Sequence, residues 1–155
     1  MYLALLVGIA VMLASLLLFS IAIALIVNLM ARVLQTGYVG QSFLKNVVIM
    51  IAVTFIVAAA HYIQIALWAA TLLALGEMSS FETAFYFSAE NYTALGYGDL
   101  VLSDRWRLLG PVEAINGLLL FGLSTAAMFA VLSRLVSSHL HPGQGHPGEA
   151  RRLDA

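Results

Sequence analysis

The chain has no cysteine, and only 10% of its 155 residues are charged. Without cysteine it can form neither disulfides nor thiolate metal sites, and its redox compartment cannot be inferred. Hydrophobic residues make up 62% of the sequence. A soluble domain is about half apolar and about a quarter charged, so this composition indicates a membrane protein. The net charge of −1 argues against a nucleic-acid partner.

The first apolar run has no charged side chain between residues 2 and 31. About 20 apolar residues cross a bilayer core, so this run is long enough to span it. A secretory signal is the competing interpretation, but no Lys or Arg precedes the run, and the run is about twice a typical signal core. We therefore expect a retained transmembrane helix over residues 1–31.

A short polar connection over residues 32–46 has Arg32 and Lys45 as its only charges. Positively charged loops stay on the cytoplasmic side, which predicts a cytoplasmic loop and an N-terminus outside the membrane. Arg134 and the basic residues after it predict a cytoplasmic C-terminus by the same rule. We expect an integral protein of the cell membrane, inner or plasma.

The second apolar run, residues 47–76, carries His61 and Gln64 on one helix face. An ionisable residue at this depth is a functional candidate. Two interpretations of His61 stay open: a neutral histidine hydrogen-bonded to a neighbouring helix, or a proton sensor.

Residues 79–93 are too few to span the membrane, yet Ser79 and Glu82 have the spacing of a helix capping box. A half-length helix at membrane depth must be buried in protein, which predicts a re-entrant pore helix. Its C-terminal dipole end would face a cation.

The last apolar run is expected to form an inner helix over residues 106–138, with Pro111 either in its first turn or at a kink. Within it, Gly117 is a candidate gating hinge or a site of close helix packing. Residues 139–155 have no apolar periodicity and are expected to form a flexible cytoplasmic tail. Its histidines are not expected to form a metal site.

Between the pore helix and the inner helix lies a segment in which two glycines alternate with other residues, Thr93-Ala94-Leu95-Gly96-Tyr97-Gly98-Asp99. Glycine tolerates left-handed backbone angles, so this segment can alternate between right- and left-handed conformations. Such a backbone can turn consecutive carbonyl oxygens to one side, where several copies around an axis replace the hydration shell of a cation.

This segment resembles the signature of the potassium-channel pore-domain family, threonine-threonine-valine-glycine-tyrosine-glycine-aspartate. The resemblance covers residues 47–138 and is to the two-helix, pore-loop type found in prokaryotes, here with an extra N-terminal helix. It implies an all-α membrane protein with three transmembrane helices, a pore helix and a filter over residues 94–99. Because one chain supplies one such segment and the family closes its pore with four, we expect a homotetramer in membrane lipid.

The resemblance also assigns residue roles. It implies that backbone carbonyls bind the permeating K⁺ at Ala94, Leu95, Gly96 and Tyr97, with Gly98 at the outer mouth. It implies support of the filter by Tyr86, Glu90, Thr93 and Asp99, and packing of Tyr97 on the aromatic residues of the pore helix, Tyr86 and Phe87. Apart from K⁺, no cofactor is expected, and a regulatory partner is unknown.

The departure at Ala94 is informative, since the family usually has threonine there and its hydroxyl adds ligands to the innermost site. Potassium-selective conduction is the leading prediction. Weakly selective conduction of monovalent cations is one alternative, and a non-conducting regulatory membrane subunit is another. An enzyme is not expected, because no nucleophile, base and acid lie together at one depth.

Overall fold

The computed structural model describes residues 2–35 and 43–140, which form four α-helices. These are α1 (Tyr2–Gln35), α2 (Phe43–Ala74), α3 (Phe81–Tyr92) and α4 (Leu109–Leu140). Three of them, α1, α2 and α4, are long and apolar enough to cross a membrane. The prediction of an all-α membrane protein with three spanning helices is confirmed, because each run is apolar over more than the thickness of a bilayer core.

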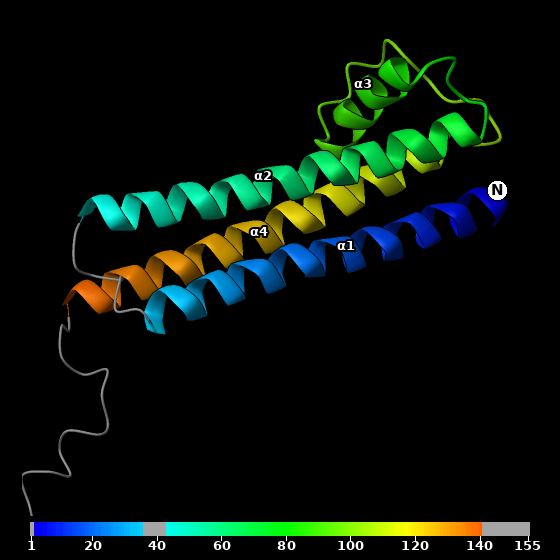
Figure 1. The fold of residues 1–155 in the computed structure, drawn as a ribbon. Helices are drawn as coiled ribbons and strands as arrows, with labels where there is room; N and C mark the ends of the chain where they lie inside the picture. The colour runs from blue at the N-terminus through cyan, green and yellow to red at the C-terminus, as the bar shows by residue number, and fades with distance from the viewer. Residues whose placement is uncertain (1, 36–42, 141–155) are drawn as a thin grey trace, which may run out of the picture.

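The three long helices lie side by side, and the short helix α3 lies at one end of them beside α2 (Figure 1). Along this bundle α1 and α4 run away from the α3 end, whereas α2 runs toward it (Figure 1). The N-terminal end of α1 therefore lies at the same end as α3. Helix α1 packs against both α2 and α4, so it belongs to the bundle.

The core has two parts along the bundle. The larger apolar cluster lies at the α3 end and includes the fully buried Trp68, Leu72, Tyr92 and Leu109. The smaller cluster joins the opposite ends of the long helices and includes Ile26, Val53 and Val131. Because α3 contributes only to the first, the α3 end of the bundle has a core of its own.

Helix α3 begins one residue later than the predicted capping box. The cap is Ser80, whose hydroxyl oxygen accepts a hydrogen bond of 3.1 Å from the backbone N–H of Thr83. The expected cap, Ser79, precedes the helix, so that prediction was wrong by one position. Either serine could act as the cap, because a serine oxygen can accept a hydrogen bond from the unpaired backbone N–H three residues later.

Helix α4 begins at Leu109, so Pro111 lies in its first turn. A proline is tolerated there because the first N–H groups of a helix have no intrahelical partner. Trp106, expected at the start of the inner helix, lies in the preceding turn and is buried, with the Arg105 guanidinium 5.1 Å from its ring centre. The connection predicted over residues 32–46 is helical at both ends, because α1 continues to Gln35 and α2 begins at Phe43. Residues 36–42 of this connection and residues 141–155 of the predicted tail lie outside the described residues.

Candidate functional site

The glycine-spaced segment has an alternating backbone. Ala94, Gly96 and Gly98 have φ angles of 56°, 56° and 75°, in the left-handed region, and the residues between them do not. The positive angles at the two glycines follow from the sequence, because glycine has no Cβ to clash. Ala94 is a finding of the structure: among the described residues it is the one non-glycine with a positive φ.

The conformation of Ala94 is set by the end of α3. Its backbone N–H donates to the Asn91 carbonyl at 2.9 Å, and that of Leu95 donates to the Glu90 carbonyl at 2.9 Å. This pair of bonds, with a left-handed residue after the helix, is the Schellman motif, in which glycine is the usual residue. The Gly96 N–H also reaches the Glu90 carbonyl, at 3.3 Å. The segment is therefore tied to the last turn of α3 by its own amides.

The predicted supporting acids meet through a tyrosine. The Tyr86 hydroxyl donates to Asp99 at 3.0 Å and lies 3.3 Å from a Glu90 carboxylate oxygen, so one hydroxyl bridges both acids. The hydrogen bond to Asp99 is the main reason that the pKa of Tyr86 rises to about 12. Glu90 is only 4% exposed. Thr93 closes the helix end with a hydroxyl bond of 2.7 Å to the Ala89 carbonyl.

The side chains of Leu95 and Tyr97 are 56% and 69% exposed in one chain. The ring contacts found among the described residues do not include Tyr97, although Phe87 is buried and Tyr86 is held by the acids. Packing of Tyr97 on those rings does not occur within one chain. It stays a prediction for contact with a neighbouring copy.

The back of α3 lies close to α4 at Gly117. A Cβ added at Gly117 would lie 1.8 Å from the Tyr92 carbonyl oxygen, so only glycine fits this contact. One turn closer to the start of α4, Glu113 is fully buried, as is Ser88 on α3. Neither the Glu113 carboxyl nor the Ser88 hydroxyl has a hydrogen-bond partner among the described residues. The close-packing interpretation of Gly117 is confirmed, and its role as a hinge stays a prediction.

His61 lies where all four helices meet. Its Nδ1 is 2.9 Å from the Tyr92 hydroxyl on α3, and its Nε2 is 3.1 Å from the Ser124 hydroxyl on α4. Its ring stacks on Phe121, with the centres 4.4 Å apart, and lies 5.7 Å from the ring of Phe19 on α1. Of the two interpretations that the sequence left open, hydrogen bonding to neighbouring helices is confirmed.

A second polar cluster fixes α1 to the bundle. The Ser15 hydroxyl of α1 donates to the Gln64 side-chain oxygen and accepts from the Asn116 amide at 2.8 Å. The Gln64 amide in turn donates to the Ser15 carbonyl at 3.0 Å. All three residues are buried. No role for the first helix could be assigned from the sequence, because these partners are 49 and 101 positions apart.

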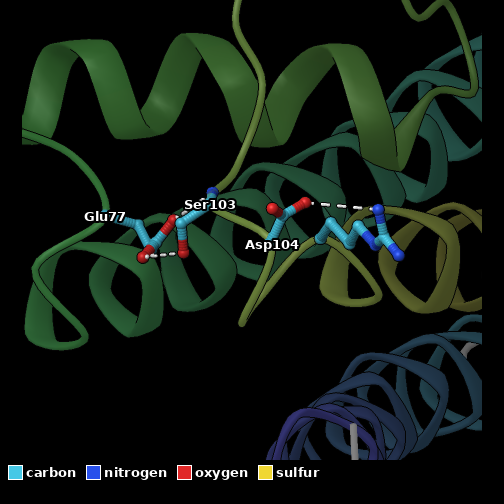
Figure 2. A network of polar contacts seen from close by, with 4 residues as sticks. Glu77, Ser103 and Asp104 are labelled. Atoms are coloured by element: carbon cyan, nitrogen blue, oxygen red, sulfur yellow. Dashed lines mark hydrogen bonds and ion pairs between the residues drawn. The ribbon is translucent and has the colours of Figure 1, made fainter.

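Near the α3 end of the bundle, the loop after the glycine-spaced segment is bound by Glu77. Its carboxylate accepts from the Ser103 backbone N–H at 2.7 Å and from the Ser103 hydroxyl at 2.8 Å (Figure 2). An exposed ion pair of 3.2 Å joins Asp104 to Arg107 in the same loop (Figure 2). The two hydrogen bonds between Glu77 and Ser103 join the turn after α2 to the loop before α4. The exposed ion pair contributes little to stability.

Within the described residues, no three His, Asp or Glu side chains lie close enough together to hold a metal ion. The described His, Asp and Glu side chains therefore do not form a metal centre. Backbone oxygens of the alternating segment are a different kind of ligand, suited to a permeating alkali cation.

Comparison with known proteins shows which family the chain belongs to. The family described as "Ion channel" matches residues 49–134, which is more than half of the chain. The chain is 37% identical over 70 residues to the voltage-gated potassium channel Kch of Escherichia coli (strain K12). That match takes in 44% of this chain but only 17% of the relative's length. No solved structure matches the chain. The chain therefore belongs to the ion channel family, and its resemblance to potassium-channel pore domains is confirmed.

Proposed function

We propose that this chain is one subunit of a homotetrameric channel that conducts K⁺ passively and selectively. The observation that carries the proposal is the alternation of positive φ at Ala94, Gly96 and Gly98, directly after a short helix. A backbone of alternating hand can present successive carbonyl oxygens to one side, as a cation filter requires. In this proposal the carbonyls of residues 94–97 bind the ion, and Gly98 forms the outer mouth.

Four copies are required because one chain supplies one segment and a ring of oxygens must close around the ion. Two observations support assembly around this segment. Residues 93–99 are exposed in a single chain, and the large side chains of Leu95 and Tyr97 have little covering them. Contact with a second copy would bury both side chains and fix the diameter of the ring.

In the membrane we place the α3 end of the bundle outside and the opposite end in the cytoplasm. Arg32, at the end of α1, and Lys45, at the start of α2, both lie at the end of the bundle away from α3. The positive-inside rule makes that end cytoplasmic. With this orientation, an ion that leaves the filter inward meets the C-terminal end of α3, whose dipole favours a cation.

The weakly selective cation channel is the second candidate, and Ala94 favours it. The methyl side chain of Ala94 has no oxygen to offer. The innermost site would therefore keep one ring of backbone carbonyls and lack the ring of hydroxyls that threonine supplies. Selectivity for K⁺ over Na⁺ would then be less steep, with the outer sites unaffected. Reversal potentials across liposomes with a K⁺/Na⁺ gradient separate the two candidates.

The decisive experiment is ion flux from the purified protein in liposomes, with Gly96→Ala compared with Gly76→Ala. Both glycines have positive φ, at 56° and 73°, and an added Cβ meets nothing within 4 Å at either position. The two substitutions therefore impose similar backbone strain, one in the filter and one in the turn after α2. We expect Gly96→Ala to abolish K⁺ flux and Gly76→Ala to retain it. Wild-type protein that assembles but passes no K⁺ would overturn the proposal in favour of a non-conducting subunit.

A further inference from the structure

The hydrogen bonds at His61 form a chain that runs in one direction. The Oγ of Ser124 lies 2.9 Å and 3.0 Å from the backbone carbonyl oxygens of Phe121 and Leu120, which can only accept, and we assign its single hydrogen to them. Its oxygen can therefore only accept from His61, so Nε2 must carry a hydrogen. Because a neutral imidazole then has Nδ1 as an acceptor, the Tyr92 hydroxyl must donate to it.

The two ends of this chain lie on different parts of the pore. Tyr92 is the last residue of α3, immediately before Thr93 and the alternating segment. Ser124 lies in α4, seven positions after the contact of Gly117 with the Tyr92 carbonyl. The phenol of Tyr92 is fully buried and has no other hydrogen-bond partner among the described residues. Its position therefore depends on His61.

We propose that His61 is a positioning residue that holds the C-terminal end of α3 against the middle of α4, as a neutral Nε2–H tautomer between Tyr92 and Ser124. This inference rests on the proposed function, because it concerns the geometry of the conducting filter. A displacement of α4 at Ser124 would be transmitted through the imidazole to the residue from which the filter begins. His61, Tyr92 and Ser124 are already buried within one chain, so the hydrogen bonds do not depend on a neighbouring copy.

Protonation of the second ring nitrogen would oppose this arrangement. Nδ1 would become a donor facing the donor hydroxyl of Tyr92, which would have to turn away. The groups facing the ring are Phe19 from α1, Tyr92 from α3, and Phe121 and Ser124 from α4. None of them is a carboxylate or a cation.

The test is a double-mutant cycle on K⁺ flux in liposomes, with Tyr92→Phe, Ser124→Ala and His61→Gln. Tyr92→Phe removes the bond to His61, and Ser124→Ala removes the bond to His61 together with the bonds to the Phe121 and Leu120 carbonyls. For each we expect about a two- to tenfold loss of steady flux. In the His61→Gln background the imidazole acceptor of the Tyr92 hydroxyl is gone, so Tyr92→Phe should have a smaller effect than in the wild type. Thr54→Ala is the control, since Thr54 is exposed on α2 and bonds only to the Met50 carbonyl.

Two further readouts separate positioning from simple stability. The ¹⁵N NMR signals that are lost in His61→Gln should be those of an Nε2–H tautomer. Acidification of the wild type should lower flux, and this pH dependence should disappear in His61→Gln. Additive losses in the cycle, or an Nδ1–H tautomer, would overturn the inference while leaving conduction intact. If the wild type passes no K⁺ at all, the proposed function fails first and the positioning role fails with it.

Discussion

At the scale of single residues, Tyr86 joins the two acids beside the filter segment. Its hydroxyl donates to Asp99 and lies within reach of Glu90, so ionisation would place a third negative charge between two carboxylates. This is why its pKa rises from 10.0 to about 12. As pH rises past 10 an unfolded chain loses this proton before the folded one does. The contribution of Tyr86 to stability is therefore complete below about pH 10 and is lost as pH rises through about 12.

We expect Tyr86→Phe to leave the fold intact and to shorten the open time of the channel about two- to tenfold, because one buried acid loses its only side-chain donor among the described residues. A tyrosinate absorbance titration of wild type minus Tyr86→Phe should show a step near pH 12. Tyr62→Phe is the matched control, since that side chain is 63% exposed on α2. Equal open times for Tyr86→Phe and Tyr62→Phe would remove Tyr86 from the support of the filter.

The conformation of Ala94 shows what sequence reasoning could not reach at this scale. Positive φ at Gly96 and Gly98 is predictable, because glycine is the residue that adopts it without strain. The same angle at Ala94 depends on which residue ends α3, and helix ends are the least predictable boundaries. The shift of the helix cap from Ser79 to Ser80 has the same origin. Both follow from hydrogen bonds that form only once the helix has a fixed register.

At the scale of helices, apolar length was sufficient to predict three spans, but not how they are rotated against one another. The bonds from Ser15 to Gln64 and Asn116 require one particular face of each helix to meet. Nearly all positions of these runs are apolar, so periodicity gives little information on the facing side. The polar residues were visible in the sequence, and their partners were not.

The contact of α3 with α4 at Gly117 gives a prediction at this scale. Gly117→Ala would place a Cβ 1.8 Å from a backbone oxygen, and the two helices must separate to admit it. We expect a loss of about 1–3 kcal/mol in the free energy of unfolding and a marked loss of flux. Both follow from the same displacement of the filter end of α3, and thermal unfolding in detergent checks the first.

Gly122→Ala on the same helix is the control, because a Cβ there meets nothing within 4 Å. It should unfold at or slightly above the wild-type temperature, as alanine favours a helix over glycine. If Gly117→Ala were as stable as Gly122→Ala and conducted normally, the close contact seen here would not exist in the assembled protein.

At the scale of the whole molecule, the first helix is integrated with the pore helices. It contacts α2 and α4 along its length, and buried hydrogen bonds fix it at Ser15. Each of these buried polar groups would be left unpaired if α1 were removed, which is costly in a low-dielectric interior. Helix α1 therefore braces α2 and α4, the two long helices of the proposed pore.

Assembly and ion binding should be linked, because in the proposed tetramer the filter oxygens converge only when four chains meet. A ligand that binds the assembled state alone stabilises it by mass action, with RT ln(1 + [L]/Kd). We expect the tetramer to melt at a higher temperature in K⁺ than in Na⁺ at equal ionic strength, measured by thermal dissociation in detergent. Ala94→Thr should enlarge this difference, because four added hydroxyls would supply ligands to the innermost site. The opposing effect is strain, since a β-branched residue is disfavoured at the positive φ of this position. Gly96→Ala should abolish it, and Gly76→Ala should preserve it. Equal melting temperatures in the two cations would contradict selective binding at this filter and favour the weakly selective channel.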